Sequence, residues 1–377
     1  MTIQFNDTVS NRSNSVAIQT AQGPIRLRKF QVALAKVMAG TANARIAFIG
    51  DSTMVGAYAD GVNAYNGNRP SSPPLLFQSN INKRRDIGVT GASLFCDAGT
   101  KPGNASLALY DTRVQYGVSW FTNLQLTGTG GKLIASIAGA LGSAADETLT
   151  FTPIEAFDTV DVYWRKVAGN GTFTIDVGGA VLATCAGSGT EVYQKTTVTK
   201  AASTGLVNLI RTATGSCFIG AIVCYNSTVK EIEVYHQGYS GSSSVEWSFS
   251  NATYSPINSI PAYSPDLTFI NLGLNDTLTN LKTYETNLTA VVNAALTTGD
   301  VVLVLCTPRE VGKVAVQEQL RQRVINIAYN LNVPYIDLYN RFGSIDLSPS
   351  FYNTDNLHLL KIGYQDVANA YADFTLG

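Results

Sequence analysis

Charged side chains are scarce in this sequence, and neither sign dominates. Among 377 residues there are 26 Lys or Arg and 27 Asp or Glu, which gives a net charge of −1. A general nucleic-acid binder needs many Lys and Arg side chains to displace the counterions of the phosphate backbone. This composition therefore argues against a nucleic-acid partner. No run approaches the ~18 consecutive apolar residues of a membrane helix, so we expect no membrane partner. The 45% of hydrophobic residues leaves ample material for a packed core.

Histidine and cysteine are also few in number. The chain has two histidines and five cysteines, with neither a CxxC pair nor Cys/His metal spacing. We therefore predict no metal site and no cofactor. Most of the cysteines are expected to be buried thiols, with a disulfide inside the middle segment left open and Cys306 placed at the end of a core strand; they are Cys96, Cys185, Cys217, Cys224 and Cys306.

The N-terminal stretch, MTIQFNDTVSNRSNSVAIQ, is polar and lacks the charged-then-apolar layout of a signal peptide. As written, the chain is not predicted to be a Sec substrate. A removed leader, another export route, an extracellular location, a virion component such as a phage tail protein, and cytoplasmic residence all stay open. The sequence predicts no oligomeric state.

The first and last parts of the chain alternate short apolar runs with helix-compatible segments. In the first part, a helical stretch over 27–38 precedes a strand over 45–49 that runs into Gly50-Asp51-Ser52. In the last part, the expected strands are 231–235, 266–272, 300–306 and 333–338, and the expected helices are 281–296, 314–331 and 362–374. Such alternation implies a parallel sheet with right-handed crossovers.

The middle part differs in composition and in its hydrophobic pattern. It is rich in Gly, Thr, Ser and Val, with short alternating runs such as 172–177 and 181–184 and turn signals such as Gly178-Gly179. This pattern is typical of a β-sandwich. The predicted organisation is therefore an α/β domain over 1–104 and 232–377, interrupted by an all-β module over 105–231.

Two separated motifs suggest nucleophilic catalysis. Ser52 follows the first predicted parallel strand, where open α/β sheets form their sites, although Asp51 and Ser52 are also ordinary helix-capping residues. His358 has the pKa of a general base, and Asp355, three residues earlier, can orient it on the same turn. Either motif alone is nonspecific, but only His236 and His358 could supply an imidazole base.

Two further loops each follow a predicted strand. Asn275, in Gly-Leu-Asn-Asp, can donate a hydrogen bond to an oxyanion or can simply make an Asx turn. The segment 236–241, His-Gln-Gly-Tyr-Ser-Gly, contains glycines that either bring a backbone N–H close to a substrate or serve a left-handed turn. We interpret His236 as a loop or substrate-contact residue rather than a catalytic one.

Together these four blocks resemble the SGNH (GDSL-like) hydrolase superfamily in type and in chain order, over roughly 40–95 and 232–377. The resemblance implies a three-layer α/β/α fold in which Ser52 is the nucleophile, His358 the base and Asp355 its orienting partner. It assigns the oxyanion hole to the N–H of Ser52, the N–H of Gly241 and the side chain of Asn275. The chain departs from the family at His236, where Asn is frequent, so Gly238 stays an alternative to Gly241, and at Leu359, where Pro is frequent.

The resemblance also suggests a substrate. The middle module is similar to carbohydrate-binding sandwiches that accompany some SGNH esterases, and its aromatic residues either stack on sugars or fill the core; these are Tyr110, Tyr116, Trp120, Tyr163 and Trp164. We therefore expect an esterase that removes acyl groups, most simply O-acetyl groups, from a carbohydrate or polysaccharide, with Asp51, His236 and Tyr239 contacting the substrate.

Two alternatives stay open. One is a small-ester or lipid-type esterase whose insert only shapes the pocket. The other is a non-catalytic polysaccharide-binding or virion protein with a degenerate hydrolase core.

Overall fold

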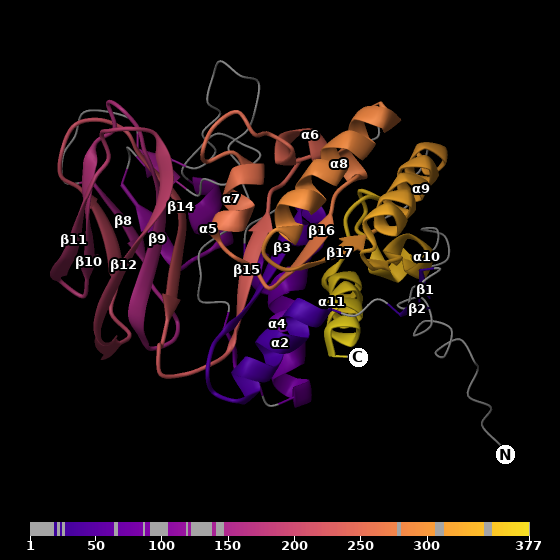
Figure 1. Cartoon of the computed structure of the whole chain (residues 1–377), viewed down its shortest axis with the longest axis horizontal. Helices are drawn as coiled ribbons and strands as arrows, with labels where there is room; N and C mark the ends of the chain where they lie inside the picture. The colour runs from indigo at the N-terminus through magenta and orange to yellow at the C-terminus, as the bar shows by residue number, and fades with distance from the viewer. Residues whose placement is uncertain are drawn as a thin grey trace.

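The computed structural model describes residues 19–20, 23–24, 27–63, 67–85, 87–90, 105–117, 120–121, 138–140, 147–276, 280–305, 313–342 and 349–376. Two bodies lie side by side in Figure 1: a layered α/β part built from both ends of the chain, and an all-β part built from its middle. This is the predicted fold class, a three-layer α/β/α arrangement with an inserted β-sandwich.

The α/β part is organised around a parallel six-stranded sheet. In spatial order its strands are β18 (Tyr335–Ile336), β17 (Asp300–Val304), β16 (Leu267–Asn271), β3 (Ala44–Gly50), β15 (Ile232–Gly238) and β4 (Val89–Thr90). Every residue of β16 is buried, as expected for a central strand that is covered on both faces. Because all these pairings are parallel, the carboxyl ends of the strands lie at the same edge of the sheet.

Helices cover both faces of this sheet. One face packs against α2 (Arg28–Met38), α4 (Pro73–Arg85) and α11 (Lys361–Leu376). The other packs against α6 (Ser244–Trp247), α7 (Pro256–Ala262), α8 (Leu281–Leu296) and α9 (Val314–Leu331). Shorter helices are α3 (Ser52–Val55), η2 (Arg69–Ser71), α5 (Ala105–Tyr110), η3 (Leu274–Asp276), α10 (Leu338–Phe342) and η5 (Pro349–Phe351), and a small hairpin pairs β1 (Gln19–Thr20) with β2 (Gly23–Pro24).

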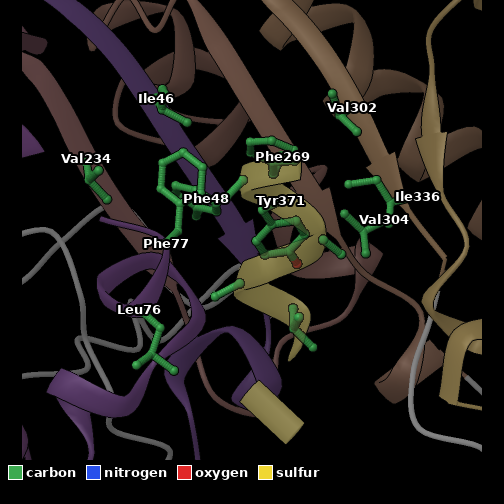
Figure 2. Packing of buried hydrophobic residues seen from close by; sticks show 14 of the residues in the cluster. Ile46, Phe48, Leu76, Phe77, Val234, Phe269, Val302, Val304, Ile336 and Tyr371 are labelled. Carbon is green, nitrogen blue, oxygen red and sulfur yellow. The ribbon is translucent and has the colours of Figure 1, made fainter. Parts of the chain in front are cut away.

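An aromatic cluster fills the core between the sheet and α11. Phe48 stacks on Phe269 at 5.0 Å between ring centroids, and Tyr371 lies 4.8 Å from Phe269. Figure 2 shows these rings between the strands and the helix, with Phe77 of α4 beside them. Because Phe48 is on the strand that ends at Gly50, this packing holds the edge of the sheet from which Ser52 projects.

The all-β part contains two five-stranded antiparallel sheets. One has the order β11 (Ala180–Ala186), β10 (Thr172–Val177), β13 (Val207–Arg211), β8 (Thr148–Phe151), β5 (Val114–Tyr116). The other has the order β12 (Val192–Ser203), β9 (Phe157–Lys166), β14 (Cys217–Tyr225), β7 (Ala138–Ala140), β6 (Trp120–Phe121). Buried and partly exposed residues alternate along β13, the period-two pattern of a sandwich strand. Gly178 and Gly179 join β10 to β11 with φ values of 61° and 86°, which glycine adopts readily.

Most element predictions agree with the structure, and the differences have local causes. Strand β15 continues to Gly238, past the expected end at residue 235, because its last residues pair with β3 up to Gly50. His236 is therefore a strand residue and not a loop residue. Strand β18 is shorter than expected, because α10 begins at Leu338. Cys185, Cys217 and Cys224 are buried free thiols, whereas Cys96 and Cys306 lie outside the described residues.

Candidate active site

The Gly-Asp-Ser turn connects β3 to α3. Asp51 caps α3: its Oδ1 accepts hydrogen bonds from the backbone N–H of Thr53 at 2.9 Å and from the Thr53 hydroxyl at 2.8 Å. A Cβ at Gly50 would approach Met54 Cβ to 2.8 Å, so the tight turn requires glycine. Ser52 is 6% exposed. Within the described chain its N–H has no hydrogen-bond partner, because the carboxylate cap is directed at Thr53.

The turn that begins at Asp355 brings a base to this serine. His358 Nε2 lies 2.8 Å from Ser52 Oγ, and His358 Nδ1 lies 2.6 Å from Asp355 Oδ2. The other carboxylate oxygen, Oδ1, accepts the N–H groups of Leu357 and His358, each at 3.0 Å. Because the carboxylate accepts from Nδ1–H, Nε2 carries the lone pair and can accept the serine proton.

The electrostatics of Asp355 suit this arrangement. Partial burial by itself raises the pKa of this carboxyl, but hydrogen bonds from the His358 ring and from the backbone outweigh it and hold the pKa below its ordinary value. The carboxylate is therefore ionised at neutral pH and stabilises the imidazolium that forms when His358 takes a proton.

The loop after β15 lies beside the serine turn. The Tyr239 N–H donates to the Gly50 carbonyl at 2.9 Å, and the Ser242 hydroxyl donates to the Tyr239 carbonyl at 2.7 Å. Gly241 has φ +73°, in the left-handed region, and its N–H has no hydrogen-bond partner among the described residues. The Gly238 N–H, by contrast, donates to His236 Nδ1 at 3.2 Å. Gly241 thus remains the better candidate for an oxyanion donor.

The loop after β16 supplies the side chain of Asn275. Its Nδ2 donates to the Ser242 carbonyl at 2.9 Å, which leaves the second N–H of the same amide able to donate elsewhere. Asn275 is exposed. Since Asn271 of β16 and Gly238 of β15 both pair with Gly50, the loops that carry Asn275 and Gly241 start on either side of the serine turn.

Asp276 is a functional candidate that the sequence analysis missed. The side chain is fully buried, and its two oxygens accept the Ser244 N–H at 3.0 and 3.1 Å, while Oδ1 also accepts the Ser244 hydroxyl at 2.6 Å. It therefore ties the loop carrying Asn275 to the loop carrying Gly241. The Gly-Leu-Asn-Asp motif contained the signal, but only its Asn was given a role.

Tyr58 was also missed, and no sequence pattern marked it. Its ring lies 5.1 Å from the His358 ring, measured between centroids, and it is partly exposed. Its φ is +60°, which costs a non-glycine residue roughly 1–3 kcal/mol.

Three residues that were expected to contact the substrate have buried side chains. Asp51 is a buried helix cap, and its burial raises the pKa of the carboxyl to about 6. Tyr239 is 1% exposed and packs in the core with Ile49 and Trp247. His236 is 3% exposed, since it lies inside β15 with Tyr110 against its ring. Burial of these side chains argues against direct contact with substrate, and their substrate-binding role stays a prediction.

Three of the aromatic residues proposed to stack on sugars, Tyr110, Tyr163 and Trp164, are likewise buried. Trp164 packs on Phe173 at 5.3 Å between ring centroids and donates its Nε1–H to the Thr196 hydroxyl. For these residues the structure shows core packing and not an exposed sugar platform. The side chains of Tyr116 and Trp120 lie outside what the structure describes.

Over the described ranges, no group of three or more His, Cys, Asp or Glu side chains is placed to hold a metal ion. In the same part of the chain, no helix is long and apolar enough to cross a membrane.

Comparisons with known proteins agree with the fold, and a family model matches a range in the last part of the chain that does not include Ser52. Residues 221–365 match the model of the GDSL-like Lipase/Acylhydrolase family, a range that includes Gly241, Asn275, Asp355 and His358. A solved structure of a peptidoglycan O-acetylesterase is similar over 92% of this chain and 94% of that one, with TM-score 0.63 and 17% identity. At that identity the likeness shows the shared fold.

Smaller solved structures match only part of the chain. A catalytic mutant of an acetylxylan esterase from Geobacillus stearothermophilus is 20% identical, covering 38% of this chain and 73% of that one with TM-score 0.34. A lipase/acylhydrolase from Enterococcus faecalis is 20% identical, covering 38% and 75% with TM-score 0.33. No curated protein matches the sequence.

Proposed function

We propose that this chain, which carries a GDSL-like acylhydrolase domain, is a serine esterase that removes O-acetyl groups from a carbohydrate through an acyl-serine intermediate. One observation carries the proposal: Ser52 Oγ, the His358 ring and Asp355 form a continuous hydrogen-bonded chain, with contacts of 2.8 and 2.6 Å. This is the arrangement in which a hydroxyl becomes nucleophilic at neutral pH.

We propose the following reaction. Ser52 Oγ bonds to the ester carbonyl carbon while its proton passes to His358 Nε2. The carbonyl oxygen becomes an oxyanion that accepts hydrogen bonds from the N–H of Ser52, the N–H of Gly241 and the Asn275 amide. The bond to the alcohol oxygen breaks, and that oxygen takes the proton from His358. Water, deprotonated by His358, then attacks the acyl-enzyme, releasing the acid and restoring Ser52.

Two observations support the carbohydrate part of the proposal. The solved structure that covers nearly the whole chain, sandwich included, is called a peptidoglycan O-acetylesterase. The low content of charged residues, 14%, suits a neutral polymer substrate. A polysaccharide outside the producing cell would in turn place the protein in an extracellular or virion setting.

Acetate release tests the proposal directly. The wild-type protein is assayed with p-nitrophenyl acetate and with a panel that includes O-acetylated peptidoglycan and acetylated xylan. Ser52→Ala and His358→Ala should each lose nearly all turnover without a change in melting temperature. The matched control is Ser188→Ala, which alters an exposed serine of the sandwich. Near wild-type turnover by Ser52→Ala would disprove the assignment of the nucleophile.

Asp355→Asn tests the third residue of the proposed catalytic chain Ser52–His358–Asp355. The Asn oxygen can still accept the backbone N–H groups, but the amide can donate to Nδ1 and so favour the wrong tautomer of His358. Turnover should fall at least about tenfold, and by as much as about 10⁴. A fall of under about twofold, at unchanged stability, would make Asp355 a capping residue of its turn and nothing more.

A further inference from the structure

The backbone conformation of Tyr58 is unusual for an aromatic residue. Its φ of +60° lies in the left-handed region that favours glycine, and Gly56, two residues earlier, is at +78°. The side chain is partly exposed and its ring lies 5.1 Å from the His358 ring, with a tilt of 36° between the planes. A tyrosine is therefore held in a glycine-like conformation at the edge of the proposed catalytic imidazole.

Hydrogen bonds fix this segment from two directions. On one side, the Ala57 N–H donates to the Ser52 carbonyl at 3.0 Å, which ties the segment to the serine turn. On the other, the Lys361 N–H donates to the Ala59 carbonyl at 2.9 Å and the Tyr364 hydroxyl donates to the Ala57 carbonyl at 2.8 Å. The surrounding structure thus imposes the conformation of Tyr58, as is typical where strain serves a site.

The reaction indicates what would lie beside this ring. His358 Nε2 takes the Ser52 proton and returns it to the alcohol oxygen of the ester, so the alcohol part must come within hydrogen-bond reach of Nε2. The Tyr58 ring is against the same imidazole, and in the described structure no hydrogen bond involves its hydroxyl. An aromatic body with a polar tip suits a partner that has both an apolar C–H face and hydroxyl groups, as a pyranose has.

We propose that Tyr58 binds the alcohol part of the ester, stacking against the sugar ring that carries the acetyl group. The inference rests on the proposed esterase function and adds which residue recognises the leaving group. Tyr58 is then a specificity-determining residue. The competing role, in which Tyr58 only holds the His358 ring in place, would affect all acetate esters alike.

Two acetate esters that differ only in the alcohol separate these roles. We would compare ethyl acetate with methyl 6-O-acetyl-glucopyranoside on wild type, Tyr58→Phe, Tyr58→Ala and Tyr58→Gly. Tyr58→Ala should lower kcat/KM for the acetylated glycoside at least about tenfold, mainly through KM, while ethyl acetate changes less than about threefold. Tyr58→Phe, which keeps the ring, should retain most glycoside activity.

Tyr58→Gly guards against a folding artefact, because glycine adopts φ +60° freely. It should reproduce the kinetics of Tyr58→Ala and melt at or above the temperature of that variant. Tyr329→Ala, at a tyrosine of α9 that is 61% exposed, is the control and should match wild type.

Each result has a distinct meaning. If Tyr58→Ala lowers kcat/KM equally for both esters, or for neither, Tyr58 does not bind the sugar ring. The esterase proposal would still stand. The same holds if wild type cleaves ethyl acetate and not the glycoside. If wild type cleaves neither ester and Ser52→Ala changes nothing, the proposed function itself fails.

Discussion

The two histidines of the chain have different surroundings and different hydrogen-bond partners. His358 contacts the serine hydroxyl, whereas His236 is enclosed within β15 and both of its ring nitrogens have partners. The Tyr110 hydroxyl donates its only proton to the Val55 carbonyl at 2.9 Å. In the 3.0 Å contact between Tyr110 and His236, the Nε2–H of His236 must therefore donate to the Tyr110 oxygen. Nδ1 then accepts the Gly238 N–H, so His236 is neutral and structural.

This neutrality makes stability depend on pH. Burial, with a further contribution from Arg69, lowers the pKa of His236 to about 3 from its ordinary 6.5. As the pH falls below 6.5, the unfolded chain takes up a proton that the folded protein does not, so stability is lost between pH 6.5 and about 3. The free energy of unfolding should be about 2 kcal/mol lower at pH 5 than at pH 8 from this group alone.

His236→Asn tests this contribution, because an Asn oxygen can accept the Gly238 N–H without titrating. Urea denaturation at pH 5 and pH 8 should show a smaller loss of stability at pH 5 in the variant than in wild type. Asp51, whose raised pKa gives a contribution of opposite sign, is present in both proteins and cancels in the comparison. An identical pH dependence in the two proteins would show that His236 is protonated in the folded state.

At the scale of elements, the candidate site depends on how two loops are tied together. The loop after β15 is joined to the loop after β16 by Asn275 Nδ2, which donates to Ser242, and by Asp276, which accepts from Ser244. The Trp247 ring supports the same loop, donating its Nε1–H to the Ser242 hydroxyl at 3.0 Å. Polar contacts between the two loops therefore help to place the proposed oxyanion donors.

Replacing Asp276 should reveal this dependence. Asp276→Ala leaves the buried Ser244 N–H without its acceptor, which costs about 1–3 kcal/mol of stability. The loop that carries Gly241 then loses its anchor, so kcat on p-nitrophenyl acetate should fall about tenfold or more, while KM changes little. Ser244→Ala keeps the N–H contacts with Asp276, removes the hydroxyl contacts with Asp276 and Asn287, and should have a smaller effect on both quantities. Lower stability with an unchanged kcat would show that Asp276 does not position the oxyanion donors.

At the scale of the whole molecule, the sandwich and the α/β part share a core. Ala47, Tyr235 and Tyr263 of the α/β part belong to the same buried cluster as the sandwich interior. The Tyr163 ring of β9 lies 4.8 Å from the Tyr263 ring, and the Arg165 guanidinium lies 4.2 Å from the centre of the Tyr254 ring. The sandwich thus packs against the α/β part through buried aromatic contacts.

This interface predicts cooperative unfolding. Calorimetry should show one endotherm for the whole protein, and Tyr263→Ala should lower its midpoint, because truncating a buried aromatic residue costs about 3–5 kcal/mol. Tyr329→Ala, at the exposed tyrosine, should leave the midpoint unchanged. Two well-separated endotherms, of which only one moves in Tyr263→Ala, would show that the parts unfold independently.

The shared core also changes one expectation about the insert. The sequence alone predicts that a protein without about residues 105–231 keeps some activity on a small acetate ester if its remaining parts fold, because the candidate catalytic residues lie outside this range. Tyr110 lies inside that range and contacts Val55 of α3 and His236 of β15. Excision would therefore remove a support of the strands that carry the site, and the boundaries of an independent module stay a prediction.

The sequence by itself determined the order of the blocks, the class of the fold and the pairing of Asp355 with His358 on one turn. Local rules suffice for these, because Asp355 and His358 share one turn, and each loop follows a strand whose apolar run is visible in the chain. Only the tertiary structure decided that His236 and Tyr239 are buried, that Asp276 is an anchor and that Tyr58 lies against His358. Burial and anchoring depend on partners distant in sequence: Tyr110 is 126 residues from His236, and Ser52 is 306 residues from His358. A periodic pattern shows which residues of a strand share a face, but not what packs against that face.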